Sequence, residues 1–384
     1  MTPAAAGIYI HIPFCIRKCP YCDFFSTSDL SLLSAFADAL IAEVRMKKKQ
    51  GAFADAVFDS VYIGGGTPTV MDTRTLVRIM GVVAETFPLL DGAEITIEAN
   101  PATICKKQLE ALRSAGVNRI NIGMQSFDDG NLSFLGRIHT ADDAVQAYRM
   151  AEKSGFDNIG IDLMYGLPGQ TSENWQKELE TAVFFEPAHI SCYMLTFEPD
   201  TPMDNARKAG QFSALDDGVQ GEFFLMTSRL LAEKGYDHYE ISNFARSRRL
   251  RSRHNTGYWN NRPYLGLGPA AHSYAPPVRE ANVRSVRRYT GRIHAGKSPV
   301  ETSERLDVRQ QMMEALYLGL RQADGICYAV FNSRFHVDFR SMFSEVIARF
   351  AEEKYIVADA AGCRPTLLGM LMQESLAEAF IEGI

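Results

Sequence analysis

The first two thirds of the chain alternate between short β-branched segments and longer amphipathic ones, and this alternation limits the possible folds more than any other feature. Six segments have the length and residue types of strands: Ile8–Pro13, Val61–Gly65, Glu94–Ala99, Arg119–Met124, Asn158–Met164 and His189–Thr196. Helical periodicity fills the gaps: Leu30–Lys48, Thr73–Thr86, Lys107–Ser114, Ala141–Lys153 and Ser172–Phe184. Such alternation predicts parallel strands joined by right-handed helical crossovers.

Six strand–helix units are fewer than the eight that close a full barrel. The competing architecture is a Rossmann-type sheet, in which G-x-G-x-x-G opens the helix after the first strand. No such motif follows the first predicted strand. We therefore expect an α/β fold built on an incomplete (β/α)6 barrel.

The pattern changes after about Glu198. A helix-like segment, Val219–Lys234, leads into an aromatic and Gly-rich region, Tyr236–Tyr274. Beyond Glu301 three further segments have helical periodicity: Glu304–Arg321, Phe339–Glu353 and Thr366–Phe380. We expect two domains, a barrel with its extension over residues 1–275 and a smaller, mainly helical C-terminal domain over residues 276–384.

The composition is that of a soluble globular protein with ample core, since 46% of the 384 residues are hydrophobic and 22% are charged. No apolar run reaches the roughly 18 residues of a membrane span. The N-terminus also lacks the basic region of a signal peptide. These features predict a cytoplasmic protein, in which seven scattered cysteines make a poor disulfide framework.

Three of the seven cysteines lie within eight residues, directly after the first predicted strand. Cys15, Cys19 and Cys22 form the pattern C-x3-C-x2-C. Three thiolates this close can bind three corners of an iron–sulfur cube and leave its fourth iron open to another ligand. A structural zinc site would need a fourth ligand. His11 is a candidate, but in an extended strand it sits four residues before Cys15.

Polar or Gly-rich sequence follows four consecutive predicted strands, where a βα barrel carries its chemistry. These ends are Gly64–Pro68, Glu98–Pro101, Gly123–Phe127 with Arg137 just beyond, and Asp162–Gly169. Each one alone could be an ordinary turn or helix cap. Together they would lie on one rim, which suits a ligand that needs many hydrogen bonds.

The cysteine pattern in this position resembles the radical S-adenosylmethionine (SAM) superfamily, in which SAM chelates the open iron. Five segments resemble more specifically the HemN/HemW group, which contains oxygen-independent coproporphyrinogen III oxidases and related haem chaperones: Tyr9–Phe14, Cys22–Phe24, Gly123–Phe127, Asp162–Gly169 and Tyr239–Phe244. The resemblance covers nearly the whole chain. It implies a [4Fe–4S] cluster on Cys15, Cys19 and Cys22 and SAM contacts that involve Tyr9, Tyr21, Gly65, Gly66, Thr67, Glu98, Gln125, Arg137 and Asp162. How many SAM molecules bind stays open, because the group has been described with two SAM sites.

Two features separate the oxidases of this group from the chaperones. The oxidases have a fourth cysteine two residues after the third and additional N-terminal sequence, whereas here that position is Phe24 and fourteen residues precede Cys15. The string H-N-x-x-Y-W from His254 to Trp259 resembles a signature of the chaperones, whose histidine is implicated in haem binding. An imidazole can ligate haem iron, and Tyr258 and Trp259 could pack on the macrocycle. Alternatively, His254 forms hydrogen bonds at the barrel rim and Trp259 fills an interdomain core.

The segment 246–292 is strongly basic, with eleven arginines, no lysine and one acidic residue, Glu280, in a chain of net charge −6. Arginine favours bidentate binding of carboxylates and phosphates. Haem propionates or anionic lipid headgroups would fit, whereas we expect no nucleic acid because the chain has no recognised nucleic-acid module.

The resemblance therefore implies a haem chaperone that carries a cluster and a SAM site, binds haem and delivers it to haem-dependent proteins. Its acceptors could include membrane-associated respiratory enzymes, and it could act as a monomer or a homodimer. The alternative is an oxidase-type radical SAM oxidoreductase of porphyrin metabolism. In that case a 5′-deoxyadenosyl radical from SAM would abstract hydrogen from a propionate side chain and lead to its decarboxylation. Whether the protein is an enzyme stays open at this point.

Overall fold

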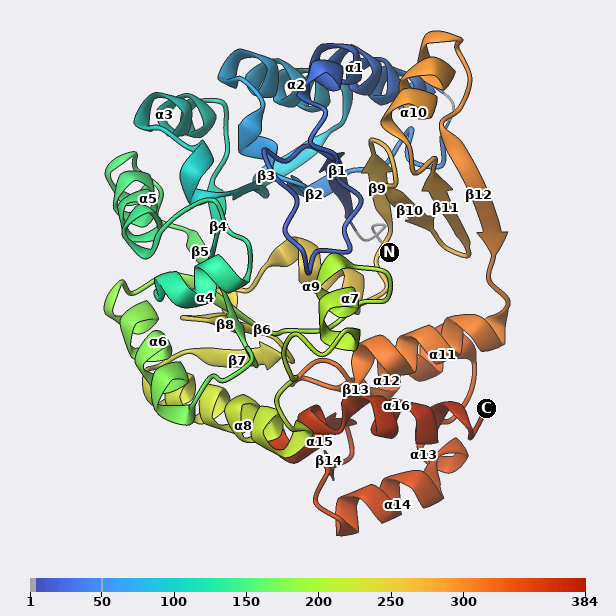
Figure 1. Ribbon diagram of the computed structural model, residues 1–384. Coiled ribbons are helices and arrows are strands. Elements are labelled where there is room, and N and C mark those ends of the chain that lie inside the picture. The colour runs from blue at the N-terminus through green and yellow to red at the C-terminus, as the bar shows by residue number, and fades with distance from the viewer. Residues whose placement is uncertain (1–4, 50) are drawn as a thin grey trace.

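The computed structural model describes residues 5–49 and 51–384, and its centre is a curved parallel sheet (Figure 1). Six strands form it: β1 (Ala6–Ile12), β2 (Phe58–Gly65), β3 (Leu89–Ala99), β4 (Arg119–Gln125), β5 (Ile159–Tyr165) and β6 (His189–Met194). Each pairs in parallel with the next in chain order. This order confirms the open barrel, because a Rossmann sheet reverses its strand order at the centre.

Helices cover the outer face of these strands (Figure 1). They are α1 (Leu33–Lys49), α2 (Thr73–Thr86), α3 (Lys106–Ser114), α5 (Ala141–Lys153), α6 (Ser172–Phe184) and α8 (Asp217–Glu233). The short helices α4 (Asp129–Phe134) and α7 (Pro202–Lys208) lie inside this ring in the same view. Side-chain caps fix several starts, because Asp72, Thr140 and Thr171 each accept a hydrogen bond from the backbone N–H three residues later. The bounds of α2, α5 and α6 are therefore those predicted from the sequence.

The aromatic and Gly-rich region, together with the residues that follow it up to Arg305, extends the sheet at both edges. Next to β1 come β9 (Tyr264–Leu267), β10 (His272–Ala275), β11 (Val278–Asn282) and β12 (Val300–Arg305), and next to β6 come β8 (Asn243–Ala245) and β7 (Asp237–Glu240). Two helices belong to this region, α9 (Arg253–Trp259) and α10 (Val286–His294). The sequence analysis missed these strands because at three to six residues they are too short for a clear alternation of polar and apolar positions.

The C-terminal part is mainly helical, as predicted, and has its own hydrophobic core. It contains α11 (Val308–Gly319), α12 (Tyr328–Phe335), α13 (Phe339–Met342), α14 (Ser344–Glu352), α15 (Leu367–Leu371) and α16 (Gln373–Ile381), with a small sheet of β13 (Ile326–Cys327), β15 (Gly362–Pro365) and β14 (Ile356–Ala358). The predicted helices Phe339–Glu353 and Thr366–Phe380 are each divided, at Phe343 and at Met372. The helices α13, α14 and α16 contribute to this core, whereas α15 contacts α8 of the barrel.

The division of the chain at residue 275 stays a prediction. The sheet order favours a later boundary near residue 306, because β11, α10 and β12 follow residue 276 yet pack with the barrel. Within the residues that the structure describes, no helix is long and apolar enough to cross a membrane.

Barrel strands send alternate side chains to opposite faces. Ile8, Ile10 and Ile12 of β1 belong to the core under the outer helices, whereas Tyr9 and His11 line a cavity on the inner side. The inner face therefore carries the polar and aromatic residues of the candidate site.

Candidate functional site

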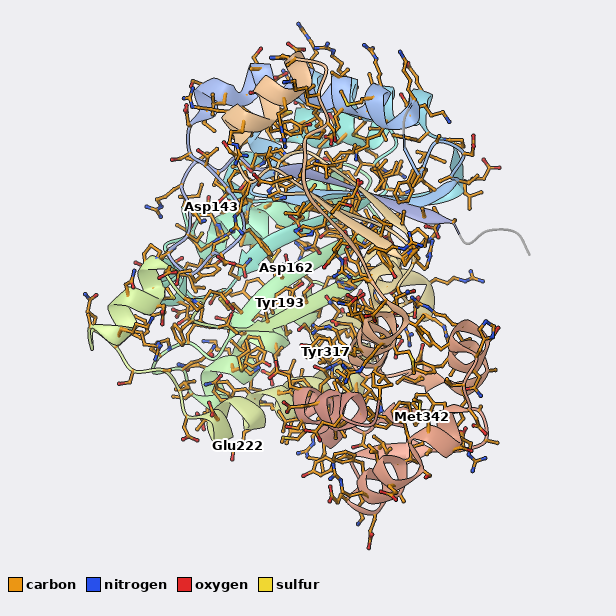
Figure 2. All side chains as sticks on the ribbon, turned by 90° about the vertical axis from the view of Figure 1, so that its right-hand side faces the viewer. Asp143, Asp162, Tyr193, Glu222, Tyr317 and Met342 are labelled. Atoms are coloured by element: carbon orange, nitrogen blue, oxygen red, sulfur yellow. The ribbon has the colours of Figure 1, made fainter. Side chains whose placement is uncertain are left out.

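The carboxyl ends of β2 to β6 surround a cavity with a volume of about 1140 Å³. Eleven of the thirteen predicted site residues line it: Cys15, Cys19, Tyr21, Cys22, Gly65, Gly66, Thr67, Glu98, Gln125, Arg137 and Asp162. The structure therefore brings these residues together on one rim, and their roles stay predictions. Figure 2 shows two of the wall residues, Asp162 and Tyr193, near the middle of the barrel.

The three cysteines lie on one loop after β1, and hydrogen bonds close this loop at its base. The backbone N–H of Cys15 donates to the carbonyl of Thr27 at 3.0 Å, and that of Thr27 donates to the carbonyl of Pro13 at 2.7 Å. Within the loop Lys18 donates to the carbonyl of Phe24 at 3.0 Å. None of the three thiols forms a disulfide, and all are half-buried against the cavity, so one loop presents them to a common space.

Hydrogen-bond donors surround these sulfurs. Thr67 donates its hydroxyl to Sγ of Cys15 at 3.6 Å, and Arg137 donates Nη1 to Sγ of Cys19 at 3.7 Å. Burial raises the pKa of Cys15, while Thr67 and the positive charge of Arg137 oppose that rise. Such donors stabilise sulfur that carries negative charge, as it does when it ligates a metal cluster.

The residues present fit an iron–sulfur cluster better than a single ion. In the described part of the chain, no three His, Cys, Asp or Glu side chains gather closely enough to hold one metal ion. A cluster instead takes each thiolate on a separate iron. Three thiols on one cavity wall, with donors beside two of them, match that requirement.

Glu98 at the end of β3 joins the Gly-rich turn after β2 to the cavity wall. Its carboxylate accepts hydrogen bonds from the hydroxyl of Tyr62 at 2.8 Å and from the backbone N–H of Gly65 at 3.1 Å. Burial raises the pKa of Glu98 to about 7, and the negative charge of Asp162 adds to the rise. The group can therefore change its charge near neutral pH.

Several polar atoms of the wall are buried without a hydrogen-bond partner in the described residues. They are Oε1 of Gln125, Nε of Arg137, Oδ1 of Asp162 and Oδ1 of Asn121. Gln125 also has a backbone φ of 70°, an uncommon conformation for a residue with a side chain. Because buried polar groups nearly always have partners, and backbone strain concentrates at functional sites, these residues indicate a polar ligand or ordered water.

The structure adds wall residues that the sequence analysis missed. Asn121 donates Nδ2 to Asp162 at 2.6 Å, and its place two residues before Gly123 on β4 could have revealed it. The C-terminal part contributes Tyr317, Arg321 and residues 370–375. No pattern in the sequence signals this contribution, because it depends on how the C-terminal part packs against the barrel.

The two other predicted residues lie outside this cavity. Tyr9 lines a second cavity of about 460 Å³. His254 lines neither cavity and is only 3% exposed. Both of its ring nitrogens form hydrogen bonds, Nδ1 with Ser60 at 3.1 Å and Nε2 with Tyr258 at 2.8 Å. In this geometry His254 could bind iron only after losing one of these bonds, and its role as an iron ligand stays a prediction.

The basic segment 246–292 is compensated in space. Eight of its eleven arginines lie within 4.0 Å of an acidic side chain: Arg246, Arg248, Arg251, Arg262, Arg279, Arg284, Arg287 and Arg288. All of these acids come from outside the segment, such as Asp237 and Asp324, which both pair with Arg251. Much of the positive charge of this segment is therefore neutralised by acidic side chains from the rest of the chain.

Comparison of the sequence with those of known proteins identifies the family of the chain. The sequence model of the radical SAM superfamily matches residues 9–182, and that of the HemN C-terminal domain matches residues 306–372. The heme chaperone HemW of Bacillus subtilis is 32% identical over 375 residues, which cover 97% of this chain and 98% of the relative. The chain belongs to the HemW family of radical SAM proteins.

Other relatives widen the family. A radical S-adenosyl methionine domain-containing protein 1, mitochondrial, of Danio rerio is 31% identical and covers 97% of this chain and 86% of its own length. Among solved structures, coproporphyrinogen III oxidase (HemN) of Escherichia coli superposes with a TM-score of 0.84 at 22% identity, over all of this chain and 91% of that one. This last likeness shows a shared fold.

Proposed function

We propose that the protein is a haem chaperone, which binds haem and passes it to haem-dependent proteins. The observation that carries the proposal is the likeness over 97% of the chain to a relative named heme chaperone HemW. The cysteine loop supports it, because the position of the oxidases' fourth cysteine is Phe24, whose side chain is 68% exposed.

In this proposal Cys15, Cys19 and Cys22 would hold a [4Fe–4S] cluster, whose open iron would bind SAM. The backbone of Gly65 and Gly66 approaches the methionine portion of SAM. Gln125, Arg137 and Asp162 use their buried polar atoms to bind the rest of the molecule.

We expect SAM affinity to depend on the charge of Glu98. With a pKa of about 7, roughly one tenth of this carboxyl is ionised at pH 6 and roughly nine tenths at pH 8. The ionised form attracts the positive charge of SAM, so affinity should rise by up to about tenfold between these pH values. Calorimetry on protein with a reconstituted cluster measures the rise, and Glu98→Gln should remove this part of it. An identical pH dependence in both proteins would contradict the role of Glu98.

The assay that separates chaperone from oxidase is anaerobic turnover with coproporphyrinogen III. Protein with a reconstituted cluster, SAM and a reductant should form no protoporphyrinogen above the level of a protein-free control, while the same preparation takes up haem. Sustained formation of protoporphyrinogen over many turnovers would overturn the proposal in favour of an oxidase.

A further inference from the structure

Gln125 ends β4 in an irregular backbone conformation. The register of β4 against β5 shifts between Gly123 and Gln125, and the backbone φ of Gln125 is 70°. An irregularity of this kind re-aims the side chain beside it. The side chain of Gln125 lines the first cavity, where its buried Oε1 has no hydrogen-bond partner among the described residues. The backbone conformation therefore decides where this amide lies.

Two residues that follow α4 hold the backbone before Gln125. Arg137 donates Nη2 to the carbonyl of Gly123 at 2.7 Å, and Nε2 of His139 donates to the carbonyl of Met124 at 2.9 Å. These bonds fix the end of β4 up to Met124. The conformation of Gln125 then depends on what holds the residues after it.

Glu178 of α6 holds the backbone after Gln125. Its Oε1 accepts a hydrogen bond from the hydroxyl of Ser126 at 2.5 Å, and its Oε2 accepts one from the backbone N–H of Phe127 at 2.7 Å. Glu178 is only 6% exposed. Burial raises the pKa of this carboxyl, and the bonds from Ser126 and Phe127 oppose the rise. A buried carboxylate needs such donors, so Glu178 and the turn after β4 stabilise each other.

Ser126 makes this contact specific for a carboxylate. It is 1% exposed, and its Oγ already accepts hydrogen bonds from the backbone N–H of Asp128 at 3.0 Å and from Nδ2 of Asn131 at 3.2 Å. A hydroxyl has one proton to donate and two acceptor positions. A glutamine at position 178 that kept the bond to Phe127 would turn its NH2 group toward this oxygen, which has no acceptor position left.

We propose that Glu178 is a positioning residue for Gln125. Through Ser126 and Phe127 it holds the turn in the conformation that directs the amide of Gln125 into the first cavity, where this amide binds SAM. The inference rests on the proposed function, because it takes SAM as the ligand. Glu178 does not itself line the cavity, so its effect on SAM passes through the turn.

A double-mutant cycle tests this coupling, with SAM affinity measured by calorimetry on protein with a reconstituted cluster. Glu178→Gln keeps the side-chain volume and should weaken SAM binding at least about fivefold, while the iron content stays that of wild type. Gln125→Ala should also weaken binding. The double variant should bind SAM within about twofold of Gln125→Ala, because Glu178 then has no amide left to position. Unchanged affinity in Glu178→Gln, or the same fold-loss with and without Gln125, would overturn the proposal.

Two variants of the same helix separate positioning from stability. Glu180→Gln changes an exposed carboxylate that is bonded to Gln176, and it should bind SAM as wild type does. Leu179→Ala removes a fully buried side chain, and it should lower the melting temperature more than Glu178→Gln does while the folded protein keeps its SAM affinity. If wild type binds SAM and the cycle shows no coupling, the inference falls and the proposed function stands. If wild type with a full cluster binds no SAM, the proposed SAM site falls and the inference falls with it.

Discussion

Replacing any one of Cys15, Cys19 and Cys22 with alanine should abolish the broad visible absorption of the reconstituted protein. Each variant removes one of only three protein ligands of the cluster. The sequence has phenylalanine where a fourth cysteine stands in the oxidases. The remaining cysteines, Cys105, Cys192, Cys327 and Cys363, do not line the cavity and cannot substitute. Optical spectra with iron and sulfide counting after anaerobic reconstitution measure the loss.

Cys105→Ala is the matched control, because this thiol is exposed at the start of α3. It should keep the full absorption and the full iron content. Stoichiometric iron and sulfide in a triple variant of Cys15, Cys19 and Cys22 would refute the assigned ligands.

Gly66→Ala should disturb the same site through the backbone. A Cβ at this position would lie 2.7 Å from the carbonyl oxygen and 2.9 Å from the nitrogen of Phe14, the residue before Cys15. The two segments are also joined by hydrogen bonds, since Gly66 N–H donates to Ile12 and Thr67 N–H donates to Phe14. The new methyl group must push the end of β1 and the cysteine loop away. We expect a loss of about 1–3 kcal/mol in the free energy of unfolding and a lower cluster content.

The control for Gly66 is a glycine with space around it. A Cβ at Gly81 in α2 would meet no atom within 4 Å, so Gly81→Ala should raise the free energy of unfolding by about 0.5–1 kcal/mol. Denaturant unfolding of the cluster-free proteins and iron counting of the reconstituted ones compare the two changes. Wild-type stability and cluster content in Gly66→Ala would contradict the close approach of the two segments.

The barrel and its rim could be predicted from the sequence because their signals are local. The helix α2, for example, has both an N-cap, Asp72, and a regular apolar face made by Leu76, Ile79, Met80 and Val83. The cysteines and the strand ends on the cavity wall are each marked by residue types at fixed spacing. Parallel topology then brings them together without further information.

The parts that could not be predicted depend on contacts between distant segments. The arginines of the segment 246–292 suggested a site for anions, yet Arg262 pairs with Asp59 and Arg279 with Glu314, acids that no local pattern connects to them. His254 stood in a signature string, but only the fold shows Ser60 and Tyr258 at its two ring nitrogens.

The most direct test of the haem-chaperone proposal is haem transfer under anaerobic conditions. Protein with a reconstituted cluster and bound haem is mixed with membranes that carry haem-free respiratory enzymes, and the haem spectrum and activity of these acceptors are followed over time. We predict that haem passes to the acceptors faster from the protein than from an equal amount of haem in buffer. Haem that stays on the protein, or that reaches the acceptors no faster than free haem, would contradict the proposal.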